Sequence, residues 1–169
     1  DVAIAYQTLL EVSREVQAEG WSFNKELHVK RTPDTNNEIL IPNNVLQMDL
    51  SPNAANMDKD VIRRNGKLYD KANHTFEFTE AVECDITWLF DWVDLPTPVA
   101  DFITARAAAI VSSRIVGDNN QYQMLQQKEA FARAMAMEYE CNQGDYTFFG
   151  HSGNTNTYSS YKPYHALYR

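Results

Sequence analysis

Residues 95–120 read LPTPVADFITARAAAIVSSRIVGDNN, and this stretch decides the fold class. Its first four residues are a helix-start signature. Thr97 can cap a helix, and Pro98 fits the first helical position, where its missing N–H costs nothing. Apolar residues then recur at helical spacing, so we expect a helix over about 98–116 that ends at Gly117. The residues expected to face inward are Val99, Phe102, Ile103 and Ile110.

A second helix should follow after a short link. The run 118–120 can cap it and Gly144 can close it, which predicts a helix over about 120–142. Because so few residues join the two helices, they should pack as antiparallel neighbours. The residues expected to face the core are Met124, Leu125, Phe131, Met135 and Tyr139.

Upstream, residues 2–19 have the pattern of an amphipathic helix with Gly20 as its C-cap. Its other face carries Glu11, Arg14, Glu15 and Glu19, as a solvated face does. The residues expected on the buried face recur at steps of three or four: Val2, Ala5, Leu9, Val12 and Val16.

The region between the first and second helices, residues 21–92, is predicted to be rich in β-structure. Asn65-Gly66 is the strongest local signal, because both residues tolerate positive φ and so favour a tight hairpin. Strands are expected where residues alternate or are β-branched, at 26–30, 39–41, 61–64, 67–69, 75–79 and 85–90. Residues 51–58 are polar and contain Pro52, which predicts a loop.

These elements predict an α+β fold. Three helices form a packed core, and a β-rich insertion that contains the hairpin lies between the first and second of them. We expect residues 1–150 to be a single domain and residues 151–169 to be an extended C-terminal arm, because the segment from His151 to Ser160 is nearly all Gly, Asn, Ser and Thr.

Composition excludes several classes of protein. The formal net charge of −8 argues against a domain that binds nucleic acid by neutralising phosphates. Because DNA is negatively charged as well, such a protein would repel DNA and let it pass without binding. No apolar run reaches the roughly 18 residues that would span a bilayer. The start of the sequence lacks the basic region and cleavage-like end of a signal peptide. It also lacks an initiator Met, so we expect some native N-terminal residues to be missing.

Motifs that carry chemistry are mostly missing from the sequence. It has no phosphate-binding loop, no nucleophile elbow and no clustered zinc ligands, so we expect no cofactor, no metal and no catalytic residue. Cys84 and Cys141 are expected to be free, partly buried thiols of a protein made in a reducing cytoplasm. Glu80, Glu83 and Asp85 lie close together, but a solvated sheet face explains them better than paired catalytic carboxylates.

Two groups of residues are candidates for an interface. The hairpin tip is basic in an acidic protein, and the C-terminal arm is rich in Tyr, which offers a large contact area at low entropic cost. Either group has a plainer explanation: a solvated turn for the first, and packing back onto the chain's own core for the second. The candidates are Arg63, Arg64 and Lys67 in the tip, and Tyr158, Tyr161, Tyr164 and Tyr168 in the arm.

In order along the chain, the motifs resemble the tail tubular protein A family of short-tailed, T7-like phages. Residues 20–24 (Gly-Trp-Ser-Phe-Asn) after the first helix and residues 137–140 (Met-Glu-Tyr-Glu) are moderately specific. The other matching pieces are the hairpin 63–70 with its Tyr-Asp ending, the helix that starts at Pro98 and ends in 114–117, residues 127–130, and residues 144–146. The resemblance covers about residues 2–149.

The resemblance implies a head-to-tail adaptor, also called the gatekeeper. Members of this family form a dodecameric ring beneath the portal, join it to the nozzle protein, and enclose the channel through which genomic DNA is ejected. It therefore implies a virion protein of the neck or tail, assembled in the host cytoplasm, with no catalytic residue. Two other classes stay open at this point. One is another phage assembly or interaction protein, either scaffolding or host-binding, and the other is a small hydrolase that uses Glu83 and Asp85.

Overall fold

The computed structural model describes residues 2–52, 56, 58–147 and 150–151. The chain divides into two compact units. The helical unit comprises the described residues of 1–23 and 90–153, and the β-rich unit comprises the described residues of 24–89. The predicted α+β fold is confirmed, with the β-rich segment inserted between the first and second helices.

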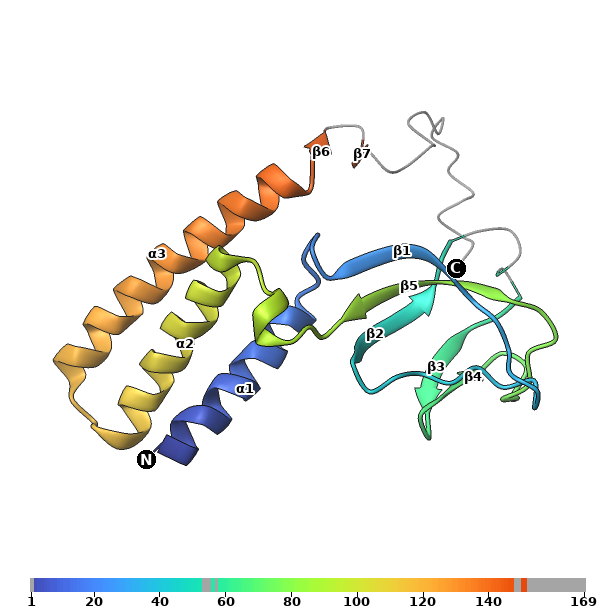
Figure 1. The fold of residues 1–169 in the computed structure, drawn as a ribbon, viewed down its shortest axis with the longest axis horizontal. Helices are drawn as coiled ribbons and strands as arrows, with labels where there is room; N and C mark the ends of the chain where they lie inside the picture. The colour runs from blue at the N-terminus through green and yellow to red at the C-terminus, as the bar shows by residue number, and fades with distance from the viewer. Residues whose placement is uncertain (1, 53–55, 57, 148–149, 152–169) are drawn as a thin grey trace. The chain divides into compact units, whose positions relative to one another are not determined.

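In the helical unit, α2 (Thr97–Ile115) lies between α1 (Val2–Ala18) and α3 (Asn119–Gln143), as Figure 1 shows. A short 3-10 helix, η2 (Trp92–Asp94), precedes α2. After α3, β6 (Tyr146–Thr147) and β7 (Gly150–His151) pair as a two-stranded ribbon. The two helices joined by the predicted short link, α2 and α3, are antiparallel neighbours, as expected.

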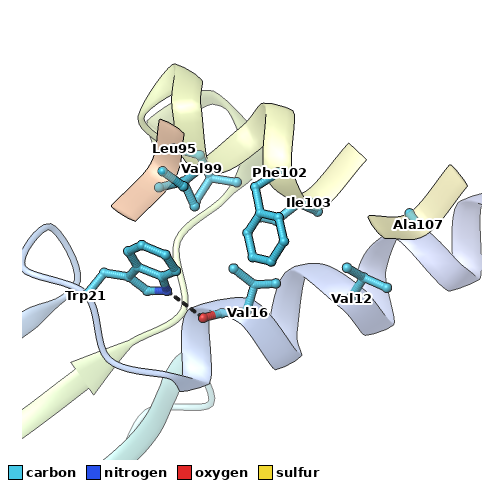
Figure 2. Packing of buried hydrophobic residues seen from close by; sticks show 9 residues of the cluster. Val12, Val16, Trp21, Leu95, Val99, Phe102, Ile103 and Ala107 are labelled. Carbon is cyan, nitrogen blue, oxygen red and sulfur yellow. Dashed lines mark hydrogen bonds between the residues drawn. The ribbon is translucent and has the colours of Figure 1, made fainter. Parts of the chain in front are cut away.

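One apolar cluster holds the helical unit together (Figure 2). Val12 and Val16 of α1 pack against Val99 and Phe102 of α2, all of them buried. The Nε1–H of Trp21 donates a 2.7 Å hydrogen bond to the carbonyl of Val16, which also accepts the backbone N–H of Glu19 at 3.2 Å, so the indole covers the last turn of α1. The predicted inward faces of the first and second helices are confirmed, with the exception of exposed Val2.

The predicted helix ends are correct to within about a residue or two, apart from one cap. Asp118 caps α3 as expected, since its carboxylate accepts the N–H of Asn120 at 2.9 Å. Gly117 adopts a φ of 69°, which only glycine reaches at low cost. Thr97 is not a cap: it is the first residue of α2, and Pro96 precedes it without a capping side chain.

The prediction for the inner face of α3 is wrong for three of its five residues. Leu125 and Tyr139 are partly buried, and Tyr139 packs on the core. Ala136 is the apolar residue of α3 that is fully buried in this unit. The residues predicted inside that are instead exposed are Met124, Phe131 and Met135. α3 carries apolar residues on two faces, and periodicity alone cannot decide which of them meets the core.

The β-rich unit contains a three-stranded antiparallel sheet in the order β1 (Lys25–Arg31), β5 (Val82–Trp88), β2 (Val45–Leu50). The central strand is buried at alternate positions, with Val82, Cys84 and Ile86 in the core. β1 is not the regular alternating strand that was expected, because its register shifts between Glu26 and Val29. β2 was not predicted, although apolar residues alternate with Gln47 and Asp49 along it.

The predicted hairpin is confirmed as β3 (Val61–Arg64) and β4 (Lys67–Asp70), paired Arg64 to Lys67 across the turn. Asn65 and Gly66 have φ values of 51° and 71°, as a tight two-residue turn requires. Residues 39–41 and 75–79 were expected to be strands but make isolated bridges, Leu40 with Lys67 and Glu38 with Glu77. The predicted loop at 51–58 falls partly on residues that are not described.

The carboxylate of Asp70 organises the turn that follows β4. It accepts backbone N–H groups of Asp60, Ala72 and Asn73 at 2.9–3.3 Å, and the Asn73 side chain at 2.8 Å. Burial by itself would raise the pKa of Asp70, but these hydrogen bonds outweigh it, so the pKa is lowered. A lowered pKa means that the ionised form stabilises the folded state.

We therefore expect Asp70→Asn to lower the free energy of unfolding by about 1–3 kcal/mol at pH 7, because an amide cannot replace all the contacts of the carboxylate. The contribution is fully present above the unfolded pKa of about 3.9 and is lost as the pH falls through the lower folded value. Urea unfolding at pH 7 and at pH 3 measures this contribution above and below the unfolded pKa. Asp60→Asn, at an exposed acid in a surface ion pair with Lys71, is the control. If Asp70→Asn lowered the free energy of unfolding equally at both pH values, the stabilising role of the ionised carboxylate would be contradicted.

Candidate interaction surfaces

The basic hairpin tip is held by contacts within its own unit. Arg63 donates from Nη1 to the carbonyl of Val45 at 3.2 Å and from Nη2 to Oδ1 of Asn43 at 3.4 Å. The guanidinium of Arg64 lies 4.2 Å from the ring centroid of Tyr69. Both arginines remain exposed, so each presents a charge whose direction is fixed.

Lys67 is the third basic residue of the tip and is less available. Its Nζ lies 2.6 Å from Oε2 of Glu38, and both side chains are partly buried. The structure therefore brings Arg63, Arg64 and Lys67 together on one hairpin, as their spacing required. Each of the three has an intramolecular partner that the sequence did not reveal.

The candidate residues of the C-terminal arm, Tyr158, Tyr161, Tyr164 and Tyr168, lie outside the described residues. Of the arm predicted from residue 151 onward, the structure describes only the backbone pairing of His151 with Tyr146. The role assigned to these tyrosines stays a prediction from composition.

The acidic residues considered for catalysis lie on the face of β5 opposite its core. Asp85 accepts the backbone N–H of His28 at 3.1 Å and the hydroxyl of Ser51 at 2.5 Å, which ties it to β1 and to the end of β2. Glu83 lies 3.8 Å from Nδ1 of His28. The two carboxylates thus bond to local structure, as expected for the polar side of a sheet.

An open groove of about 730 Å³ runs beside these residues, between β2 and β3. Charged groups of both signs line it, among them Asp49, Asp85, Lys25 and Arg63. Within the described ranges, no three His, Cys, Asp or Glu residues gather as a metal site would require. None of the helices described is long and apolar enough to cross a membrane.

The two cysteines differ sharply in environment. Cys84 is fully buried in the core of the β-rich unit, and burial raises its pKa to about 12. Cys141 is an exposed free thiol on α3, contrary to the expectation that both are partly buried. Because the thiolate is the reactive form, a thiol reagent should modify Cys141 alone in the folded protein and both residues in denaturant. Mass spectrometry after brief alkylation checks this, and rapid modification of native Cys84 would contradict it.

Two of the sequence motifs meet in the helical unit. The carboxylate of Glu140, near the end of α3, accepts the backbone N–H of Ser22 at 2.9 and 3.0 Å and its hydroxyl at 2.8 Å. Ser22 follows Trp21, whose ring packs in the core cluster. A second link joins the same helices, since Arg133 pairs with Glu19 at 3.3 Å. The motif at 20–24 and the one at 137–140 are therefore two halves of one junction.

Many exposed apolar side chains of the helical unit lie on α1 and α3, in addition to those of η2 and of the end of α2. Sequence reasoning placed several of them in the core, and only their solvent exposure in the folded unit shows otherwise. They are Val2, Ile4, Tyr6 and Leu10 on α1, and Met124, Phe131, Met135 and Met137 on α3. Large apolar patches on a folded surface are typical of contacts with other proteins.

A family model described as tail tubular protein matches residues 1–146. The chain belongs to the tail tubular protein family. This tail tubular protein is thus a structural component of a phage tail, and the junction between Ser22 and Glu140 lies within the matched residues. No curated protein matches the chain at a significant level.

Proposed function

We propose that this tail tubular protein is the head-to-tail connector of a short-tailed phage. Copies would form a ring, a dodecamer by the resemblance of its motifs, that joins the portal above to the tail nozzle below and encloses part of the DNA ejection channel. The family match over residues 1–146 is the observation that carries this proposal. In this role the chain catalyses no reaction and needs no cofactor.

Physical considerations support a ring. A 169-residue chain whose described part is a helical unit and a small β-rich unit is too small to enclose a channel for duplex DNA by itself. Closing a ring from identical copies requires two different faces on each copy, and α1 and α3 each expose apolar side chains. With a net charge of −8 per copy, twelve copies would carry roughly −100 formal charges, which disfavours adhesion of DNA to the channel wall.

Native mass spectrometry and electron microscopy of the purified chain, alone and mixed with its portal, test this function. We expect closed rings of a fixed number of copies that attach to the portal, and the same chain in the protein composition of purified virions. Monomers alone in the presence of portal would overturn the proposal. Absence of the chain from mature particles would instead favour a scaffolding role.

Removing residues 151–169 tests the proposed arm separately. We expect the truncated chain to unfold at the same temperature as the full chain, because the segment from His151 to Ser160 is nearly all Gly, Asn, Ser and Thr and offers little apolar surface to bury. Its binding to the ring partners should weaken, because four tyrosines of contact area are lost. Unchanged assembly, measured by native mass spectrometry, would remove the arm from the interface.

A further inference from the structure

Three of the exposed apolar residues of α3 form one stripe, whereas exposed Met137 lies about 120–160° around the helix from them. Met124, Phe131 and Met135 are seven and four residues apart, which places them within about 40° of one another around the helix. Their side chains are 71%, 70% and 43% exposed. We call these three residues the α3 stripe.

The α3 stripe lies beside the face of α3 that packs on the core. Ala136 packs in the core, and Arg133 reaches Glu19, directly after α1, and lies over the ring of Phe102 of α2. Both residues lie about 140–160° around the helix from Phe131, and Ala132 and Tyr139, which pack against the core, lie about 80–100° from it. The stripe therefore forms an outer edge of the three-helix layer, on the side opposite α1.

A second stripe lies on the first turns of α1. Val2, Tyr6 and Leu10 follow one another at steps of four and are 85%, 58% and 47% exposed. Glu15, which bonds to Arg106 of α2, lies about 140–180° around the helix from Tyr6 and Leu10. The α1 stripe, defined by these three apolar residues, therefore faces away from the contact of Glu15 with α2.

The two helices that carry the stripes run in the same direction. Glu15 meets Arg106 while Glu11 meets Arg114, so α1 is antiparallel to α2. α3 returns from α2 through a short link and is antiparallel to it as well, as Figure 1 shows. Neighbours in a ring of twelve differ by a rotation of about 30°, so α3 of one copy and α1 of the next would run nearly parallel.

Charges at the ends of the two stripes are complementary in this parallel arrangement. Arg14 follows Leu10 by four residues, and Glu138 follows Met135 by three. Both side chains are exposed, and neither forms an ion pair within the described part of the chain. When Tyr6 and Leu10 lie beside Phe131 and Met135, the same register brings Arg14 next to Glu138.

We propose that the α3 stripe of one copy packs against the α1 stripe of the next copy, and that Arg14 and Glu138 pair at the end of this seam. The inference rests on the ring proposed above and names the faces that close it. The occupant is a second copy because the two faces match in apolar character, direction and charge. Each copy carries both the α1 stripe and the α3 stripe, so the contact between copies is heterologous, as closing a ring requires.

Charge exchange across the seam is the first test. Arg14→Glu and Glu138→Arg, each alone, place like charges together and should lower the fraction of chain in rings by about tenfold. The double variant R14E/E138R restores opposite charges, so its ring fraction should return toward the wild-type value. Failure of the double variant to recover, with both single variants impaired, would overturn the pairing.

Loss of the apolar contact is the second test. Phe131→Glu should lower the ring fraction by about 30-fold or more, as expected for a central aromatic contact. Gln123→Glu is the matched control, because it adds the same charge to the same helix about 100° from Met124. Thermal unfolding of both variants should match the wild type, since both positions are exposed. Equal ring fractions for the two variants would overturn the seam.

Cross-linking tests the register directly. In a Cys141→Ser background, Leu10→Cys and Met135→Cys in one chain should give a ladder of disulfide-linked oligomers on oxidation, while buried Cys84 stays reduced. Either single cysteine should give no ladder beyond dimers. If the wild-type chain forms rings but the double variant gives no ladder, the proposed seam is refuted and the proposed connector function is not. A wild-type chain that forms no ring with its portal would refute both.

Discussion

Replacing Phe102 by Ala should destabilise the helical unit by about 3–5 kcal/mol, as expected for removal of a fully buried aromatic side chain. Phe102 has no solvent exposure and lies at the centre of the cluster that joins α1 to α2. Its ring also contacts the guanidinium of Arg133, 5.3 Å from the ring centroid, so the link to α3 weakens as well. Urea unfolding followed by tryptophan fluorescence reports the loss, and Trp21, one of the three tryptophans of the sequence, packs in the same cluster.

Phe131→Ala is the control for this experiment. It removes the same atoms from the same unit, but Phe131 is 70% exposed on α3. We expect it to change the free energy of unfolding by no more than about 0.5 kcal/mol, as for most surface substitutions. Comparable losses for the two variants would mean that the assignment of the inner and outer faces of α3 is wrong.

Glu140→Ala should cost about 2–4 kcal/mol, because it breaks charge-assisted hydrogen bonds to Ser22 and leaves a half-buried N–H without its acceptor. Glu140→Gln keeps one acceptor oxygen and should cost about half as much. The same unfolding measurement gives both values, and the Trp21 signal should shift because Ser22 follows this indole directly.

Asp101→Asn serves as the matched change for Glu140→Gln, since it neutralises an exposed carboxylate in the same unit. Its effect should stay within about 0.5 kcal/mol. If Glu140→Gln proves as mild as this control, the junction between the two motifs does not stabilise the fold.

The elements whose geometry is set by local backbone chemistry could be predicted from the sequence. Asn65 and Gly66 adopt the positive φ values that a tight hairpin requires, so residues 61–70 fold as expected. Pro98 near the start of α2, Asp118 before α3 and Gly117 after α2 likewise mark helix ends through interactions within a few residues. These rules need no knowledge of distant parts of the chain, because each is satisfied by neighbouring atoms.

The contacts and exposure of the candidate interface residues could not be predicted without the tertiary structure. The residues of the basic tip were visible in the sequence, but the partners of Arg63 and Lys67 come from segments 18–29 residues away. α3 has apolar side chains on two faces, and only the packing of α2 against Ala136 decides that Phe131 stays outside.

The sequence by itself determined the fold class, the hairpin, the order of the three helices and the motifs that resemble the family. Tertiary structure alone decided that Ser22 meets Glu140 across 118 residues, and which apolar side chains of α1 and α3 stay exposed. The physical reason is that local geometry depends on neighbouring residues, whereas burial depends on which distant surfaces come together and exclude water.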